Sequence, residues 1–445
     1  MTARSLLTAL ALLAAAPACA DTAFPARLAA HAVLPALSLI VPPADAPRDS
    51  WVSGKFTGPD GPARRVTAPM SLPGAYGIAR PFIGQPLQGL SGFAMQHAAD
   101  GSIYALTDNG FGSKANSPDA LLFFHRIVPD FETGTVEVRE TVFLRDPDFR
   151  VPFRIALEGT DARYLTGADF DPESIQIVGE NVWIGEEFGP YLIRATLDGR
   201  VLSVHPTISG GTELRGPDHP AVSALSAAGT DWQVPRSGGY EGMALQPGSG
   251  LLWAMLEKPI LAPDGTPEGQ FLRVMAFDPA TGVWTGDAFR FPLADGATAI
   301  GDFNFIDDTR ALVIERDNGE GDPSLACSGD RAPDCFPNPA RVKNVVLIDT
   351  ESVDANGLVR RIGHIDLMNI ADPDGLARLE TDAARDLTGI FTFPFFTIED
   401  VILWDDSHIL VANDNNLPFS SGRKLGAAAN NELILLSVPG LLTAD

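Results

Sequence analysis

Residues 171–190 read DPESIQIVGENVWIGEEFGP. This stretch predicts a β-hairpin, with two strands and a turn at residues 174–178, 182–185 and 179–181. Glu173 stands at the start of the first strand, and Glu186 and Glu187 stand at the end of the second. Antiparallel pairing brings the start of one strand and the end of the next to the same edge, so we expect Glu173 and Glu186 to lie close together. Two such charges need a cation or a shared proton between them.

The same hairpin pattern recurs along the chain. Five copies are legible, the opening one and those at residues 90–110, 240–259, 301–319 and 398–416. A carboxylate begins the first strand in four copies, Ser91 takes that place in the other, and an acidic or amide side chain closes the second strand in all five. Ordinary turn chemistry is the alternative explanation, but it accounts for Asp and Asn better than for Glu. The repeats predict an all-β propeller with long inter-strand insertions and six blades, the sixth formed from the chain termini.

Composition agrees with one folded domain. The chain has 445 residues, of which 45% are apolar and 20% charged, so a sizeable core is available. All-β folds of this length are often one domain. We therefore expect a single propeller domain over residues 21–445, with N-terminal strands completing the last blade by pairing with residues 433–438.

The N-terminus has the features of an export signal. Arg4 precedes an apolar run, and residues 18–20 have the small-x-small form that signal peptidase cleaves, so residues 1–20 are expected to be a signal peptide. No later run is long enough to span a membrane. In the periplasm or the extracellular medium, Cys327 and Cys335 are expected to form a local disulfide, since no nearby histidines suggest a metal site instead.

The formal net charge of −25 and the absence of several motifs argue against nucleic-acid binding and against the common classes of catalytic and metal-binding site. Nucleic-acid binding is disfavoured because no Lys/Arg cluster offsets this charge. No nucleophile elbow surrounds Ser91, and no His-Glu-x-x-His, phosphate-binding loop or EF-hand is present.

We expect a monomer whose partner is a small-molecule ester.

The remaining chemistry is that of oxygen ligands. Carboxylates suit hard cations, and calcium is the natural ion for an exported protein. Glu173 and Glu241 are the predicted catalytic residues, because a metal clamp with activated water hydrolyses an ester without a protein nucleophile. Lys114 and Arg316 are predicted substrate contacts, with salt bridges to neighbouring acids as the alternative. The predicted metal ligands are Asp108, Glu173, Glu186, Glu187, Glu241, Glu257, Asp302 and Glu315.

Several short motifs carry a family resemblance. They are LSGF at residue 90, TDNGFG at 107, DFDPES at 169, GEEFGPYL at 185, YEGMAL at 240 and LEKP at 256. Together they resemble the bacterial phytase-like family, which has esterase-like activity and is related to calcium-dependent β-propeller phytases. The resemblance implies a propeller and a calcium-dependent hydrolase of phosphate or other esters. Fewer basic residues are found here than in the best-known phytases, so phytate itself is not implied. The matching acidic positions are Asp108, Glu173, Glu186, Glu187, Glu241 and Glu257.

Three functions remain open at this point. The leading one is hydrolysis of a phosphate ester by water activated between calcium ions in an acidic axial site. A lactonase-like propeller, in which one metal polarises a carbonyl, is the second. The third is a secreted binding module in which calcium is structural and no turnover occurs.

Overall fold

The computed structural model describes residues 21–58, 66, 70–71, 78–328, 335–379 and 389–445. The expected signal peptide at residues 1–20 lies outside the described residues. Within these described residues, helix is confined to two 3-10 segments and one short α-helix, η1 Arg48–Trp51, η2 Pro323–Leu325 and α1 Pro439–Leu442. No helix in the described ranges is long and apolar enough to cross a membrane.

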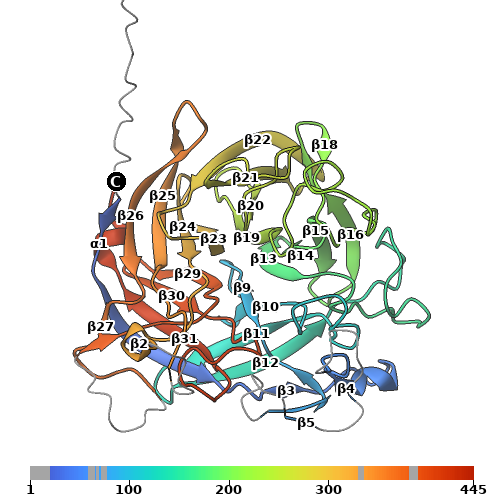
Figure 1. Ribbon diagram of the computed structural model, residues 1–445, viewed down its shortest axis with the longest axis horizontal. Helices are drawn as coiled ribbons and strands as arrows, with labels where there is room; N and C mark the ends of the chain where they lie inside the picture. Colours follow the sequence, from blue (N-terminus) through green and yellow to red (C-terminus); the bar gives the residue numbers. More distant parts are fainter. Residues whose placement is uncertain (1–20, 59–65, 67–69, 72–77, 329–334, 380–388) are drawn as a thin grey trace, which may run out of the picture.

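The described chain folds into five four-stranded antiparallel blades arranged around one axis (Figure 1). Blade 1 contains β9 Leu90–Phe93, β10 Ile103–Thr107, β11 Phe123–Asp130 and β12 Thr135–Phe143. Blade 2 contains β13 Pro172–Val178, β14 Asn181–Glu186, β15 Tyr191–Thr196 and β16 Val201–Pro206. Blade 3 contains β19 Tyr240–Leu245, β20 Leu252–Leu256, β21 Phe271–Asp278 and β22 Val283–Pro292.

The last two blades also hold N-terminal strands. Blade 4 contains β23 Ala299–Phe305, β24 Arg310–Arg316, β25 Lys343–Val353 and β26 Val359–Asp366, with β1 Thr22–Ala23 added in parallel to β26. Blade 5 contains β29 Asp400–Asp405, β30 His408–Ala412, β31 Asn431–Ser437 and β2 Ala26–Leu34. Strand β2 pairs antiparallel with β31 and also touches β12 of blade 1. The N-terminal strand thus joins the last blade to the first.

The all-β propeller is confirmed, but the expected number of six blades is wrong. The inner strands β9, β13, β19, β23 and β29 each contact the next, and β29 contacts β9. This closes the ring and leaves no gap for another blade. In the described part of the chain, β2 completes blade 5 by pairing with β31, and β1 is added to blade 4, so the terminal strands form no further blade.

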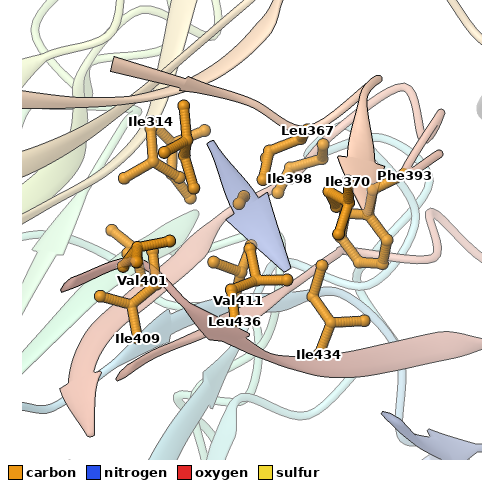
Figure 2. Packing of buried hydrophobic residues seen from close by; sticks show 14 of the residues in the cluster. Ile314, Leu367, Ile370, Phe393, Ile398, Val401, Ile409, Val411, Ile434 and Leu436 are labelled. Carbon is orange, nitrogen blue, oxygen red and sulfur yellow. The ribbon is translucent and has the colours of Figure 1, made fainter. Parts of the chain in front are cut away.

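The core lies between neighbouring blades. Figure 2 shows one such layer, between blades 4 and 5, where Ile314 on β24 faces Val401 on β29. Both side chains are fully buried, and each such aliphatic residue stabilises the fold by roughly 1.5–3 kcal/mol. Because side chains alternate along each strand, the apolar ones point toward the adjacent blades. Polar side chains lie at the ends of the strands.

The expected insertions form four two-stranded sheets in the described chain. They pair β3 Leu39–Ile40 with β8 Gln85–Pro86, β4 Val52–Ser53 with β7 Phe82–Ile83, β5 Met70–Ser71 with β6 Ala79–Arg80, and β17 Ile208–Ser209 with β18 Thr212–Glu213. A further pair, β27 Ile370–Ala371 with β28 Ile390–Phe391, is joined to blade 5 because β27 pairs in parallel with β2. The predicted disulfide between Cys327 and Cys335 is confirmed, with the two Cα atoms 4.8 Å apart.

Candidate functional site

A cavity of about 330 Å³ opens where the inner strands of the blades converge. Two basic side chains line it, those of Lys258 and Arg316. Among the described residues, eight carboxylates also line it: Asp108, Asp171, Glu173, Glu187, Glu241, Glu257, Glu399 and Asp414. The ring closure therefore gathers acidic residues that are far apart in the sequence around one small volume.

The first set of these carboxylates is placed by β-bulges. In blades 2 and 3 the register shifts near the start of the inner strand, leaving Glu173 and Glu241 without a partner on the next strand. A bulge turns the extra residue away from the regular ladder. In blade 5 the equivalent residue is Glu399, one residue before the ladder begins at Asp400. We call this place in each blade the bulge position, and its occupants in order are Ser91, Glu173, Glu241, Gly301 and Glu399.

The second set lies at the end of the second strand of each blade, or just after it. Blade 2 shows how the place is defined: Ser174 follows the bulge position and pairs with Gly185, and Glu187 lies two residues after Gly185. The same count gives the corresponding residue in blades 3 to 5. We call this the strand-end position. Its occupants in order are Asp108, Glu187, Glu257, Arg316 and Asp414. Four blades thus place a carboxylate here and blade 4 places an arginine.

Glu186 does not line the cavity. The bulge makes Pro172, not Glu173, the register partner of Glu186, and strand alternation points Glu186 and Glu187 in opposite directions. The Glu186 carboxylate is fully buried. It accepts hydrogen bonds, at 2.7 to 2.9 Å, from the backbone N–H groups of Phe188, Gly189 and Tyr191. Glu186 therefore stabilises the turn that contains Phe188 and Gly189.

Glu315 and Asp302 also lie outside the cavity lining. Glu315 precedes the strand-end position of blade 4 as Glu186 does in blade 2, and Arg361 donates to its two oxygens at 2.7 and 2.8 Å. Asp302 accepts hydrogen bonds from the backbone of Phe303 and Val401, both at 2.7 Å. These carboxylates are satisfied by protein donors, so neither has the free oxygens that a metal ligand needs.

Lys114 lies behind the cavity wall. Its Nζ donates to the carbonyl oxygen of Asp218 at 2.7 Å and stands 4.8 Å from the centre of the Phe188 ring. Burial lowers the pKa of Lys114, although Glu186 and Asp171 act in the opposite direction. Of the two predicted substrate contacts, the structure places only Arg316 in the cavity. The charged cavity residues that are absent from the predicted site are Asp171, Glu399, Asp414 and Lys258.

Crowding of carboxylates in a buried site perturbs their protonation. Burial first, and then the charge of the nearby Asp108, raise the pKa of Asp171 to about 8. Burial also raises the pKa of Glu399 to about 8. The pKa values of Glu173 and Glu187 lie well above the usual value, first through burial and then through neighbouring acids. Without a cation, the cavity therefore holds several protons at neutral pH.

Two sets of three carboxylates in the described chain are close enough to share a cation. The first set is Asp171, Glu173 and Glu187, and the second is Glu187, Glu241 and Glu257. Within each set the ligand atoms lie within 4.8 Å of one another, and Glu187 belongs to both. We call them the first and second triads.

The two triads differ in their counter-charges. No Lys or Arg in the described ranges forms an ion pair with a carboxylate of the first triad. Asp171 Oδ1 and Glu187 Oε1 are buried and accept no hydrogen bond from the described protein. In the second triad, Arg316 Nη2 lies 2.8 Å from Glu257, and Lys258 Nζ lies 2.6 Å from the same carboxylate. The first triad therefore fits a hard divalent cation better, because its oxygens have no positive partner.

Comparison with known proteins agrees with the motifs. Residues 85–417 match the phytase-like family, described as esterase-like activity of phytase. This chain belongs to the phytase-like family. The range over which this phytase-like protein matches its family contains the eight cavity carboxylates named above.

Matches to individual proteins are much weaker. No curated protein matches the chain. Among solved structures, a luciferin-regenerating enzyme is 9% identical, covering 80% of this chain and 94% of that one, with a TM-score of 0.33. The glutaminyl cyclase of Myxococcus xanthus is 10% identical (79% and 91% covered, TM-score 0.34), and an arabinanase of Bacillus subtilis is 11% identical (79% and 94% covered, TM-score 0.33). The propeller is established here by its own strand pairing rather than by these distant likenesses.

Proposed function

We propose that this phytase-like protein is an exported, calcium-dependent hydrolase of esters, with phosphate esters as the preferred class. The first triad is the observation that carries the proposal. Asp171, Glu173 and Glu187 converge on one point, and no Lys or Arg of the described residues pairs with them. Asp171 and Glu187 each have one buried oxygen that accepts no hydrogen bond from the described protein. Carboxylate oxygens in this arrangement are ligands that calcium prefers. These three residues would hold the ion.

A calcium ion bound there supplies positive potential and Lewis acidity to an ester oxygen. The protein's own groups supply the rest. Lys258 and Arg316 line the same cavity and add positive charge, which favours an anionic ester over a neutral one. Glu241 also faces the cavity, and burial followed by the charges of Glu399 and Glu257 raises its pKa well above the usual value. When ionised, a carboxylate in this place can accept a proton from the attacking water, and a bound cation nearby would favour the ionised form.

Export and the oligomeric state belong to the same proposal. The Cys327–Cys335 disulfide supports an oxidising compartment, because such bonds persist in exported proteins. The cavity is built entirely from one chain, which suits a monomer acting on a small-molecule ester.

The test is hydrolysis of a panel containing a phosphomonoester, a phosphodiester, a carboxylester and a lactone, with calcium and with chelator. We expect calcium-dependent hydrolysis of a phosphate ester. Glu241→Gln should lower kcat by about 10²- to 10⁴-fold, the usual contribution of a general base. Glu173→Gln should raise the calcium concentration needed for half-maximal activity on the order of 10- to 100-fold. Glu180→Gln is the matched control, because Glu180 is exposed in the turn of the same hairpin as Glu173.

Hydrolysis that continues unchanged in chelator and in both cavity variants would rule out this function. Turnover of lactones alone would indicate the lactonase-like alternative. Calcium-dependent stabilisation with no turnover across the panel would indicate a binding module.

A further inference from the structure

We propose that Arg316 is a built-in cation that occupies the second triad, where a metal ion would otherwise bind. This inference deepens the proposed function and rests on its assignment of calcium to the first triad. It concerns the second triad. There the positive charge of the guanidinium takes the place of a metal ion and limits the number of calcium ions that the cavity binds.

The register of the blades supports this assignment. Arg316 occupies the strand-end position, which holds Glu187 in blade 2 and Glu257 in blade 3. Blade 4 also lacks a carboxylate at its bulge position, where it has Gly301. A Cβ atom at Gly301 would lie 1.8 Å from the carbonyl oxygen of Ile398, so no side chain fits there. Blade 4 is thus the one blade that brings positive charge and no acid to these two positions.

The contacts of Arg316 are those of a shared cation. Its Nη2 lies 2.8 Å from Glu257, 3.6 Å from Glu241 and 3.9 Å from Glu399. Only 4% of Arg316 is exposed, so water does not screen these charges. Although burial alone lowers its pKa, the surrounding acids, Glu257 first, raise it above the usual value. The guanidinium is therefore charged at any physiological pH and touches three carboxylates at once.

A buried lysine fixes Arg316 in this place. Lys343 is fully buried, and its Nζ donates to the carbonyl oxygens of Asp317 at 2.8 Å and Phe396 at 2.9 Å. Asp317 follows Arg316 in the chain, and the Phe396 ring lies 5.7 Å from the Arg316 guanidinium carbon. Lys343 thus holds both the backbone next to Arg316 and the backbone of the residue whose ring lies beside the guanidinium.

Removing this charge should open a second cation site. In Arg316→Met, the second triad keeps its three carboxylates within 4.8 Å of one another and loses the guanidinium that contacts two of them. Lys258 still pairs with Glu257, but among the described residues neither of the other two carboxylates then has a paired cation. Glu187 would then bridge two ions. In Arg316→Lys the positive charge remains, so no site should open.

The experiment measures calcium stoichiometry by titration calorimetry, with elemental analysis of the gel-filtered protein. Arg316→Met should bind one more calcium ion than the wild type, and Arg316→Lys should bind the same number. Arg236→Met is the matched control: it removes the same charge from an exposed arginine paired with Asp218, and it should leave the number unchanged. Adding Glu257→Gln to Arg316→Met should remove the extra ion.

A folded Arg316→Met that binds the same number of ions as the wild type would overturn the role of Arg316. An Arg316→Met chain that folds only with calcium supports the proposal, because the ion then replaces the lost charge. One that stays unfolded at saturating calcium while Arg316→Lys folds would overturn it. A wild type that binds no calcium contradicts the proposed function instead, so the two failures are distinguishable.

Discussion

Raising the pH should destabilise the calcium-free protein, and two cavity carboxylates set the size of the effect. In the folded protein, the pKa values of Asp171 and Glu399 are both about 8, raised from 3.8 and 4.5, with burial as the main cause. Between pH 6 and pH 7 both groups are protonated in the folded state and ionised in the unfolded chain. The folded state binds more protons, so stability falls as pH rises.

Each group contributes about 1.4 kcal/mol per pH unit, so the pair contributes about 2.7 kcal/mol per pH unit. Unfolding entropy is about 2.1 cal/mol/K per residue, or about 0.9 kcal/mol/K for a chain of 445 residues. The pair should therefore lower the Tm by about 3 °C per pH unit. Calcium at about 100 times its Kd should restore about 2.7 kcal/mol, and because it keeps Asp171 ionised, it should also reduce the pH dependence.

The assay is differential scanning calorimetry of metal-stripped protein at pH 6 and pH 7, beside the double variant Asp171→Asn, Glu399→Gln. Histidines titrate in both proteins and cancel in the comparison. The wild type should lose about 3 °C more than the double variant over this interval. Equal slopes in the two proteins, or a wild type that becomes more stable than the variant as pH rises, would refute the reasoning.

Three further substitutions test other parts of the fold. Glu315→Gln should destabilise the protein by about 3 kcal/mol in denaturant titration, because it weakens the buried pair with Arg361, yet leave calcium affinity unchanged. Gly301→Ala should cost more than about 4 kcal/mol or prevent soluble expression, since its Cβ would overlap the carbonyl oxygen of Ile398; wild-type stability there would be contrary to the structure. Cys327→Ser should lower the free energy of unfolding by about 2.5 kcal/mol, because the disulfide no longer closes its loop in the unfolded chain. As a check, the Tm of this variant should equal that of the wild type with its disulfide reduced.

Much of the fold was predictable because each blade leaves a local signature. Alternating apolar residues and the turn in residues 171–190 correctly indicate the β13–β14 hairpin, and the other copies indicate the remaining blades. The blade count was not predictable in this way. Whether terminal strands form a blade or extend one depends on long-range pairing, as between β2 and β31, which leaves no local pattern in the sequence.

The sequence predicted part of the set of residues that line the cavity. The structure brings Asp108, Glu173, Glu187, Glu241 and Glu257 into the cavity. Glu186 and Glu315 precede the strand-end position, and strand alternation sends them elsewhere; the register shift that decides this is not visible in the sequence. Glu399 and Asp414 had a signal, since they begin and close the fifth copy of the hairpin.

The most direct test is calorimetric titration of calcium into metal-stripped protein. The first triad predicts that the wild type and the exposed-turn variant Glu180→Gln bind calcium with equal affinity. Glu173→Gln removes one charged ligand and should weaken binding on the order of 10- to 100-fold. A wild type that shows no calcium binding, or a Glu173→Gln variant with wild-type affinity, would contradict the assignment of the cation to these carboxylates.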